Sequence, residues 1–492
     1  MNKFSFEIKD KFGENYCRKN FIAPAREEDD CFVFYSLHND ELLKYNLEQK
    51  LQKKVLFEIK SEEKVIDEID KIYRDEEKYN ILRDINLRYK DDITLKENEK
   101  EDSPAVRVLD YIIRQSIIRN ASDIHIEPRF QDIVARIRID GALNELMRLP
   151  KNIYPHLVTR IKILSKLDIS EKRLPQDGRF SFKFKNEDID IRVATTPTGT
   201  GEKIVLRILD VQRISYTPEG IGLSGENLDK VMNLISQPSG LILCCGPTSS
   251  GKTSSLYTIL RKIQKDDINI MTIEDPIEYK IDGINQIEVN PNTGLTFEKG
   301  LKAILRMDPD KVMIGEIRNE DTAHIAISSS ITGHLVLSTL HTESSPASIG
   351  RLIDMGIEPY LISAGLIGVI SQRLIRKLCP HCKEKIKNTN PLVNSKYVYR
   401  ASGCEKCNSG YSGRIAVFEI MIVDSEIRQM ITNRESVAKI KEVSIKKGMN
   451  TLSHEILNLI ENGETTFEEF YKNVHTVGEL WFIGIRHLKG RK

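Results

Sequence analysis

The chain has 492 residues, of which 40% are hydrophobic and 29% charged, and this composition predicts an ordinary globular protein of about three domains. Its 73 basic and 72 acidic residues leave a formal net charge of +1, which argues against nucleic acid or an anionic membrane as the main partner. No apolar stretch is long enough to span a bilayer and the first residues lack the apolar core of a signal peptide, so we expect a cytoplasmic protein.

The first hundred residues contain no chemical motif. Residues 1–89 mix short apolar runs with charged segments of helical spacing, and we interpret them as a small adaptor domain. Residues 90–103 are interpreted as a linker, because this stretch is nearly all charged and cannot bury enough apolar surface to fold. An exposed helix end is the alternative interpretation.

A second domain is predicted for residues 104–218. Ser103 is a good N-cap, Pro104 suits a first helical turn, and apolar residues then recur at helical spacing. Residues 133–140 alternate as a strand does, and Asp140-Gly141 follows as a hairpin turn. Helical and strand patterns in one segment indicate an α+β domain.

From residue 219 the chain alternates apolar strands with longer helices, which predicts an α/β domain with a largely parallel sheet. A glycine-bounded loop lies between a buried-looking strand, residues 241–245, and a helical segment, residues 253–263. Its glycines let backbone N–H groups turn toward phosphates, while Lys252 reaches the β and γ oxygens and the Thr253 hydroxyl ligates Mg²⁺. The loop predicts a protein that binds ATP or GTP. The predicted nucleotide-binding residues are Gly246, Pro247, Thr248, Ser249, Ser250, Gly251, Lys252, Thr253 and Ser254.

Acidic residues follow two further apolar strands. Glu274, Asp275 and Glu278 come at the end of one strand, where a parallel sheet gathers its ligands. Glu316 ends another strand, and its carboxylate is suited to polarising the attacking water or to holding Mg²⁺ through a water. The usual strand-terminal aspartate is missing there, so Glu316 must supply its function or Asp275 must share it. For Glu278, a solvated loop acid is an equally good interpretation.

Two histidines, His334 and His341, bracket the next buried-looking strand. Each alone would more often be a packed or capping histidine. Because ligands gather at the carboxyl ends of parallel strands, the polar residues 338–341 could sense the γ-phosphate.

Two Cys-x-x-Cys pairs are separated by a short segment that contains none of the other cysteines. This spacing matches tetrahedral Zn²⁺ ligation, and four thiolates fill the coordination shell, so a structural role is favoured over catalysis. In a reducing compartment the same pairs favour metal over disulfides. The predicted zinc ligands are Cys379, Cys382, Cys404 and Cys407.

Together these motifs resemble those of the secretion ATPase superfamily, specifically the assembly ATPases of type II secretion systems and type IV pili. The resemblance covers roughly residues 104–475. Residues 272–278 resemble the family's aspartate box, residues 305–318 its Walker B region and residues 332–342 its histidine box. In the second domain, residues 122–128, 173–180 and 201–209 are similar to the family's N-terminal recognition domain.

The resemblance implies an α/β fold built from several parts. A RecA-like ATPase domain carries the P-loop, and a PAS-like α+β recognition domain precedes it. The expected boundaries are 1–89 for the adaptor domain, 90–103 for the linker, 104–218 for the recognition domain, 219–378 for the ATPase domain, 379–415 for the zinc subdomain and 416–492 for a C-terminal helical region.

The resemblance also implies roles for residues of this chain. Lys252 and Thr253 would hold ATP and Mg²⁺, with Asp275 as a further magnesium ligand. Glu316 would orient the water, and arginines of the recognition domain would close over the nucleotide, where a guanidinium stabilises charge developing on the γ-phosphate. Arg192 and Arg207 fit that pattern, whereas Arg136 and Arg138 are better explained as a salt-bridged strand face. The expected catalytic set is Glu316, Glu274, Arg192, Arg207, His334 and His341.

By resemblance, we expect a homo-hexamer that hydrolyses ATP to assemble pilin-like filaments in a type II secretion, type IV pilus or DNA-uptake system. Its expected partners are an inner-membrane platform protein and a membrane-anchored adaptor, with pilin-like subunits moved indirectly and no direct contact with nucleic acid. It would attach peripherally to the inner face of the plasma membrane. The alternatives are a conjugation-type DNA-transfer ATPase, a pilus retraction ATPase and a nucleotide-gated scaffold that does not hydrolyse ATP.

Overall fold

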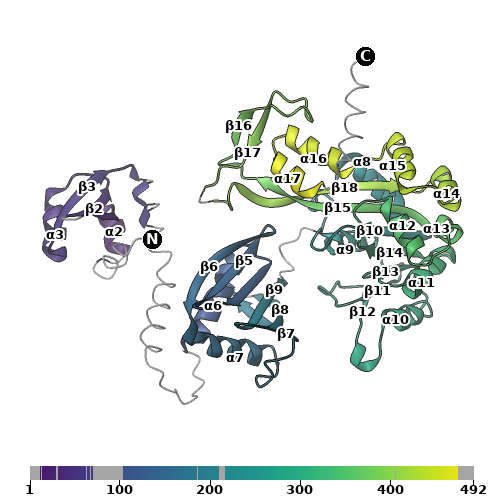
Figure 1. Cartoon of the computed structure of the whole chain (residues 1–492), viewed down its shortest axis with the longest axis horizontal. Helices are drawn as coiled ribbons and strands as arrows, with labels where there is room; N and C mark the ends of the chain where they lie inside the picture. The colour runs from purple at the N-terminus through teal and green to yellow at the C-terminus, as the bar shows by residue number, and fades with distance from the viewer. Residues whose placement is uncertain are drawn as a thin grey trace. The chain divides into compact units, whose positions relative to one another are not determined.

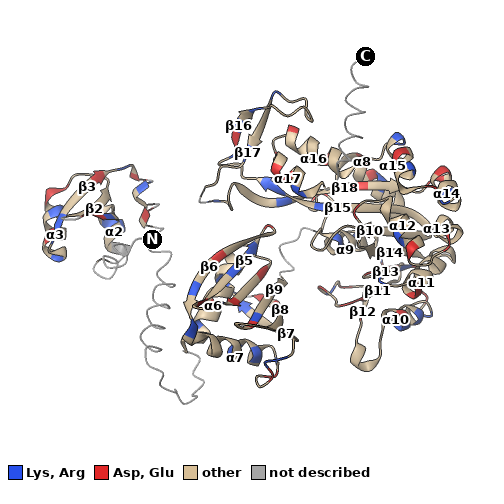
Figure 2. Cartoon of the chain, in the orientation of Figure 1, with Lys and Arg blue, Asp and Glu red and all other residues tan. Residues whose placement is uncertain are grey.

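The structure is a computed structural model that describes residues 12, 14–28, 31–62, 64–66, 68–69, 103–185, 187–209, 216–404 and 406–474. The predicted linker therefore lies outside the described residues up to residue 102. The chain divides into two compact units, Met1–Ile208 and Leu209–Lys492. Figure 1 shows their elements, and Figure 2 shows acidic and basic residues interspersed along both units, as the near-neutral composition predicts. Among the described helices, none has the length and apolar character needed to cross a bilayer.

The first unit begins with a small α/β region. Three strands lie in the order β1-β2-β3, with β1 antiparallel and β3 parallel to β2. The parallel pairing requires a crossover, and a helix whose N-cap is Asp40 provides it. The elements are α2 (Glu14–Asn20), β1 (Ile22–Glu28), β2 (Cys31–Ser36), α3 (Glu41–Leu51) and β3 (Lys54–Ile59).

The rest of the first unit is a six-stranded sheet with two helices in one hydrophobic core. The predicted N-cap is confirmed, because the Ser103 hydroxyl accepts a hydrogen bond from the backbone N–H of Val106. The predicted hairpin is also confirmed, since Asp140 and Gly141 both have positive φ. The sheet order is β6-β5-β4-β9-β8-β7. The elements are α6 (Pro104–Ile118), β4 (Asp123–Pro128), β5 (Asp132–Ile139), β6 (Ala142–Pro150), α7 (Tyr154–Leu164), β7 (Gln176–Phe184), β8 (Glu187–Thr198) and β9 (Gly201–Leu209).

The second unit is built on a seven-stranded sheet in the order β12-β11-β13-β14-β10-β15-β18, which is parallel except for β18. Alternate residues of β10 enter different cores: Leu241 and Leu243 face one, Ile242 and Cys244 the other. Burial on both faces explains why this strand is a continuous apolar run. The strands are β10 (Gly240–Cys245), β11 (Ile270–Glu274), β12 (Asn285–Glu288), β13 (Lys311–Ile314), β14 (Leu335–Leu340), β15 (Leu366–Leu378) and β18 (Tyr411–Ile422).

Helices cover both faces of this sheet. Side chains of α8 and α9 enter one core, and side chains of the helices from α10 to α15 enter the other. The helices are α8 (Gly225–Ile235), α9 (Lys252–Ile263), α10 (Phe297–Ile304), α11 (Glu320–Ile331), α12 (Ala347–Asp354), α13 (Pro359–Gly365), α14 (Ser425–Thr432), α15 (Val437–Lys446), α16 (Leu452–Glu461) and α17 (Phe467–Asn473). The mixed α/β architecture confirms the predicted fold class.

A small lobe is inserted between β15 and β18. It contains the two-stranded sheet of β16 (Glu384–Lys387) and β17 (Tyr397–Arg400) and the two cysteine pairs. The predicted boundary between residues 415 and 416 falls inside β18, which pairs with β15 as the antiparallel edge of the large sheet. Residues 411–422 thus belong to the ATPase sheet, and the helices from α14 onward follow it.

Candidate active site and metal centre

The phosphate loop joins the carboxyl end of β10 to the first residue of α9, so the positive end of the helix dipole lies at the loop. Gly246 and Gly251 have φ values of +149° and +90°. A Cβ on Gly246 would lie 2.6 Å from the Gln372 carbonyl oxygen, and one on Gly251 would lie 2.7 Å from Gln372 Nε2. Both positions therefore require glycine.

Polar groups of the loop are arranged for an anionic ligand. Lys252 is buried, and its Nζ donates to the carbonyls of Gly246 at 2.8 Å and Pro247 at 2.9 Å. Burial lowers the pKa of Lys252, while the nearby Glu316 carboxylate opposes this shift. The Ser250 hydroxyl is buried without a hydrogen-bond partner among the described residues, and Thr253 is exposed in the first turn of α9. An orphaned hydroxyl, a buried ammonium and a helix N-terminus fit a phosphate group.

Two residues of β15 that sequence reasoning missed form the floor of the loop. Gln372 Oε1 accepts a hydrogen bond from Ser255 Oγ at 2.8 Å. Arg373 is buried and donates to the carbonyl of Glu343 at 2.8 Å, in the segment that follows β14. The signal that could have found them is a polar Gln-Arg pair that follows the apolar first half of the strand, because buried polar side chains need specific partners.

Glu316, His341, Arg318 and Asp275 meet at the carboxyl edge of the sheet. Glu316 lies two residues beyond β13 and pairs with Arg318 and, at 3.5 Å, with His341 Nε2. Arg318 also contacts Asp275 Oδ2 at 3.2 Å, so it bridges two carboxylates from different strands. Sequence reasoning gave Arg318 no role, because nothing local marks which acids an arginine will reach.

Glu274 has a different setting from Glu316. It is buried, and its Oε1 accepts hydrogen bonds from Thr272 at 2.6 Å and Gln286 at 3.0 Å. Its Oε2 accepts from the Tyr257 hydroxyl. With three donors on a buried carboxylate, Glu274 has a fixed orientation. A direct catalytic role for it stays a prediction.

Within this chain, His334 lies far from the predicted catalytic residues at the carboxyl edge of the sheet. It precedes β14, and its Nδ1 lies 3.1 Å from the Ser329 carbonyl oxygen. The phosphate loop follows the other end of β10, which is paired in parallel with β14. A strand of this length separates the two histidines by about 20 Å at roughly 3.3 Å per residue, so only His341 lies at the carboxylate edge.

The predicted arginines lie on neighbouring strands of the first unit, Arg192 on β8 and Arg207 on β9. Arg207 pairs with Asp123 at 2.9 Å and keeps 54% of its side chain exposed. Arg136 pairs with Glu127 at 2.7 Å and Arg138 with Asp123 at 3.8 Å, which confirms the predicted salt-bridged face. Roles for Arg192 and Arg207 at a nucleotide stay predictions.

The four predicted cysteines converge in the inserted lobe, with all Sγ atoms within 4.8 Å of one another. Sγ–Sγ distances are 3.9 Å between Cys379 and Cys404 and 3.7 Å between Cys382 and Cys407. A tetrahedral zinc with Zn–S bonds of about 2.3 Å requires S–S distances of about 3.8 Å. The cluster is therefore compatible with zinc, and Gly410, with a φ of +90°, forms the turn after the second pair.

The chain matches known proteins over most of its length. The family described as Type II/IV secretion system protein matches residues 98–472. The chain belongs to this family. As a member, it is an ATPase, an activity that uses a nucleotide with Mg²⁺.

Curated relatives carry the corresponding names. The chain is 44% identical to the type II secretion system protein E of Dickeya dadantii over 378 residues, covering 75% of this chain and 76% of the relative. It is 39% identical to the type IV pilus assembly ATPase PilB of Thermus thermophilus over 475 residues, covering 93% of this chain. It spans about half of that relative, 53% of its length.

Solved structures support the fold. The pilus retraction motor PilT with bound ADP superposes with a TM-score of 0.54 at 28% identity, covering 75% of this chain and 98% of the motor. The ATPase DotB of Legionella pneumophila gives a TM-score of 0.57 at 21% identity, covering 77% of this chain and 98% of that ATPase.

Proposed function

We propose that this chain is the hexameric motor that assembles pilin-like filaments in a type II secretion, type IV pilus or DNA-uptake system. Lys252 and Thr253 hold ATP and Mg²⁺, Glu316 orients the attacking water, and Arg192 and Arg207 close over the nucleotide. The protein works in the cytoplasm at the inner face of the plasma membrane. Residues 1–89 dock a membrane-anchored adaptor.

The observation that carries the proposal is the phosphate loop with Glu316 at the same edge of the sheet. Strands β10, β14 and β13 pair in parallel, so the loop after β10 and Glu316 beyond β13 both lie at the carboxyl edge, with β14 between the two strands. Arg318 and His341 contact Glu316 and limit the directions in which its oxygens can point. This arrangement suits water activation beside a γ-phosphate.

Assembly is favoured over retraction or DNA transfer by relatives named as a pilus assembly ATPase and a type II secretion protein. Hydrolysis would move the two units, and a platform protein would convert that motion into lifting of filament subunits. The near-neutral charge and the mixed charges in Figure 2 offer little attraction for DNA. A DNA-transfer ATPase would instead be stimulated by DNA, and a retraction motor would leave filaments abundant in a deletion strain.

The Glu316→Gln variant tests the catalytic assignment. We expect ATP binding to be retained and kcat to fall by about 100-fold or more, because the amide cannot accept a proton from water. Fluorescent-nucleotide binding and phosphate release would be measured on the full chain. The matched control is Glu298→Gln on α10, whose exposed carboxylate pairs with Lys302 on the same helix. Normal turnover by Glu316→Gln would overturn the assignment.

The same variant tests the cellular role. Affinity capture of the stalled Glu316→Gln motor should recover a polytopic platform protein and pilin-like subunits. Recovery of DNA-transfer components instead would assign the chain to the alternative class.

A further inference from the structure

A stack of three tyrosines and one arginine lies beside the acids of the second unit. The rings of Tyr216 and Tyr279 have centroids 4.6 Å apart, and Tyr279 meets Tyr257 edge-on at 4.4 Å and 71°. The Arg261 guanidinium lies 4.6 Å from the Tyr216 ring and 5.7 Å from the Tyr279 ring. Edge-on rings and cation–π contacts have preferred geometries, so each group restrains the next.

The stack ends on Glu274. The Tyr257 hydroxyl donates to Glu274 Oε2 and also accepts the backbone N–H of Glu278 at 3.3 Å. Burial raises the pKa of Tyr257 and of Tyr279 far above the usual value, so both phenols remain protonated. Tyr257 is therefore a permanent donor that fixes the Glu274 carboxylate.

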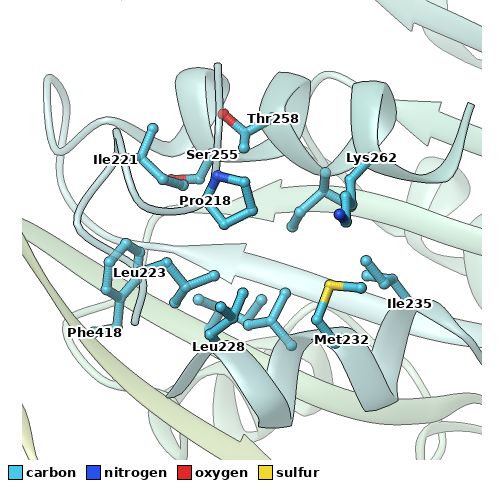
Figure 3. Close-up of a pocket in the computed structure, with 13 residues that line it drawn as sticks. Pro218, Ile221, Leu223, Leu228, Met232, Ile235, Ser255, Thr258, Lys262 and Phe418 are labelled. Carbon is cyan, nitrogen blue, oxygen red and sulfur yellow. The ribbon is translucent and has the colours of Figure 1, made fainter. Parts of the chain in front are cut away.

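The stack begins on the segment that follows the first unit. Tyr216 is the first described residue after residues 210–215, which follow the end of β9. Downstream, Pro218 and Ile221 line an apolar pocket with Ser255 and Thr258 of α9 (Figure 3). Arg261 belongs to the same helix, so residues 216–221 border α9 both at the tyrosine stack and at the pocket.

We propose that Tyr216 is a positioning residue for ATP hydrolysis. Through Tyr279 and Tyr257 it joins residues 216–221 to Glu274, and its ring supports Tyr257, which is one of the three donors to this carboxylate beside Thr272 and Gln286. The inference rests on the predicted role of Glu274 in hydrolysis. A displacement of residues 216–221 would then change turnover through these side chains without changing the phosphate loop.

The test compares Tyr216→Ala with Tyr216→Phe in the full chain. Tyr216→Ala should lower kcat by about tenfold, because the Glu274 carboxylate loses part of its support. KM for ATP should change by less than about twofold, because the phosphate loop keeps its contacts. Tyr216→Phe keeps the ring and should retain the wild-type kcat. The matched control is Tyr360→Ala, an exposed tyrosine of α13 outside the stack, which should leave kcat unchanged.

A double-mutant cycle with Tyr257→Phe tests the route. If both residues act through Glu274, the kcat of the double variant falls by less than the product of the two single effects. A full multiplicative loss, an unchanged kcat in Tyr216→Ala, or an equal loss in Tyr216→Phe would each overturn the inference. Should thermal melting show that Tyr216→Ala does not fold, Tyr216→Leu replaces it under the same criteria. Absence of hydrolysis by the wild-type chain would overturn the proposed function as well.

Discussion

The glycines of the phosphate loop have no space for a larger side chain. Gly246 is enclosed by the Gln372 carbonyl and the Ser250 hydroxyl, each 2.6 Å from the position that a Cβ would occupy, while Lys252 folds back onto the loop carbonyls. The loop backbone is therefore closely constrained, and its two carbonyls are acceptors that compete with phosphate oxygens for the Lys252 ammonium.

Gly246→Ala should impair both stability and nucleotide binding. The clash and the positive φ lead us to expect a loss of about 1–3 kcal/mol in the free energy of unfolding. Urea denaturation and fluorescent-nucleotide titration would measure the two effects. Gly199→Ala is the control, since a Cβ there meets nothing within 4 Å. Wild-type affinity of Gly246→Ala for the nucleotide would contradict the expected steric clash in the loop.

Some residues of the site could be predicted from the sequence and others could not. The phosphate loop and the cysteine pairs were predictable because their chemistry is encoded in short, contiguous spacing. Arg318 and Gln372 were not, because their partners come from other strands. Glu274 and Glu316 look alike in sequence as strand-terminal acids, yet one is buried under three donors and the other pairs with Arg318 and His341.

An ion pair between Arg376 of strand β15 and Glu469 of helix α17 joins these two elements. Arg376 Nη2 lies 2.8 Å from Glu469 Oε1, and the Glu469 side chain is 2% exposed. The Arg376 guanidinium also lies 3.9 Å from the Tyr411 ring of β18. Glu469 further accepts the backbone N–H of Arg376 at 3.0 Å, so its loss would leave several donors without an acceptor.

Glu469→Ala should lower the free energy of unfolding by about 3 kcal/mol, because it leaves Arg376, whose side chain is only 19% exposed, without its counter-charge. Glu464→Ala is the matched control, since Glu464 pairs with Lys377 on the surface, and we expect a change of at most about 1 kcal/mol. Urea unfolding of both variants would be compared. Equal stability of the two variants would show that the buried pair does not hold α17.

The sequence predicted the strands and the helix around the phosphate loop but missed the place of β18. A short apolar run and helical spacing are local signals, and they identified the strand before the phosphate loop and the helix after it. The pairing of β18 with β15 joins residues separated by the whole zinc lobe, as in Gly368 with Ile422. No local pattern reports such a partner, so the helical interpretation of residues 416–492 began inside a strand.

The molecule as a whole places its predicted catalytic groups in two separate compact units. The phosphate loop and Glu316 lie in the second unit, and Arg192 and Arg207 in the first. If Arg192 and Arg207 act as proposed, turnover depends on the relative position of the two units, because part of the charge that stabilises the transition state then comes from outside the P-loop domain.

Arg207→Gln should therefore lower kcat/KM by about tenfold or more with a smaller effect on stability, since the Arg207 side chain is half exposed and Arg138 also lies 3.8 Å from Asp123. Steady-state ATPase assays and thermal unfolding would measure both. Arg148→Gln is the control: its side chain is 55% exposed, similar to 54% for Arg207, and it pairs with Asp132 and Glu145 on the same sheet. Equal activity of the two variants would remove Arg207 from the proposed mechanism.

Strand β15 runs from the phosphate-loop floor to the cysteine cluster. Gln372 and Arg373 lie under the loop, Arg376 holds α17, and Cys379 follows the last residue of the strand. Residues 366–371 of β15 pair with β10, and the strand pairs with β18 from residue 368 to its end, so an extended, hydrogen-bonded backbone joins the phosphate-loop floor to the cysteine lobe. A displacement of the cysteine lobe would therefore be transmitted along β15 to the phosphate loop.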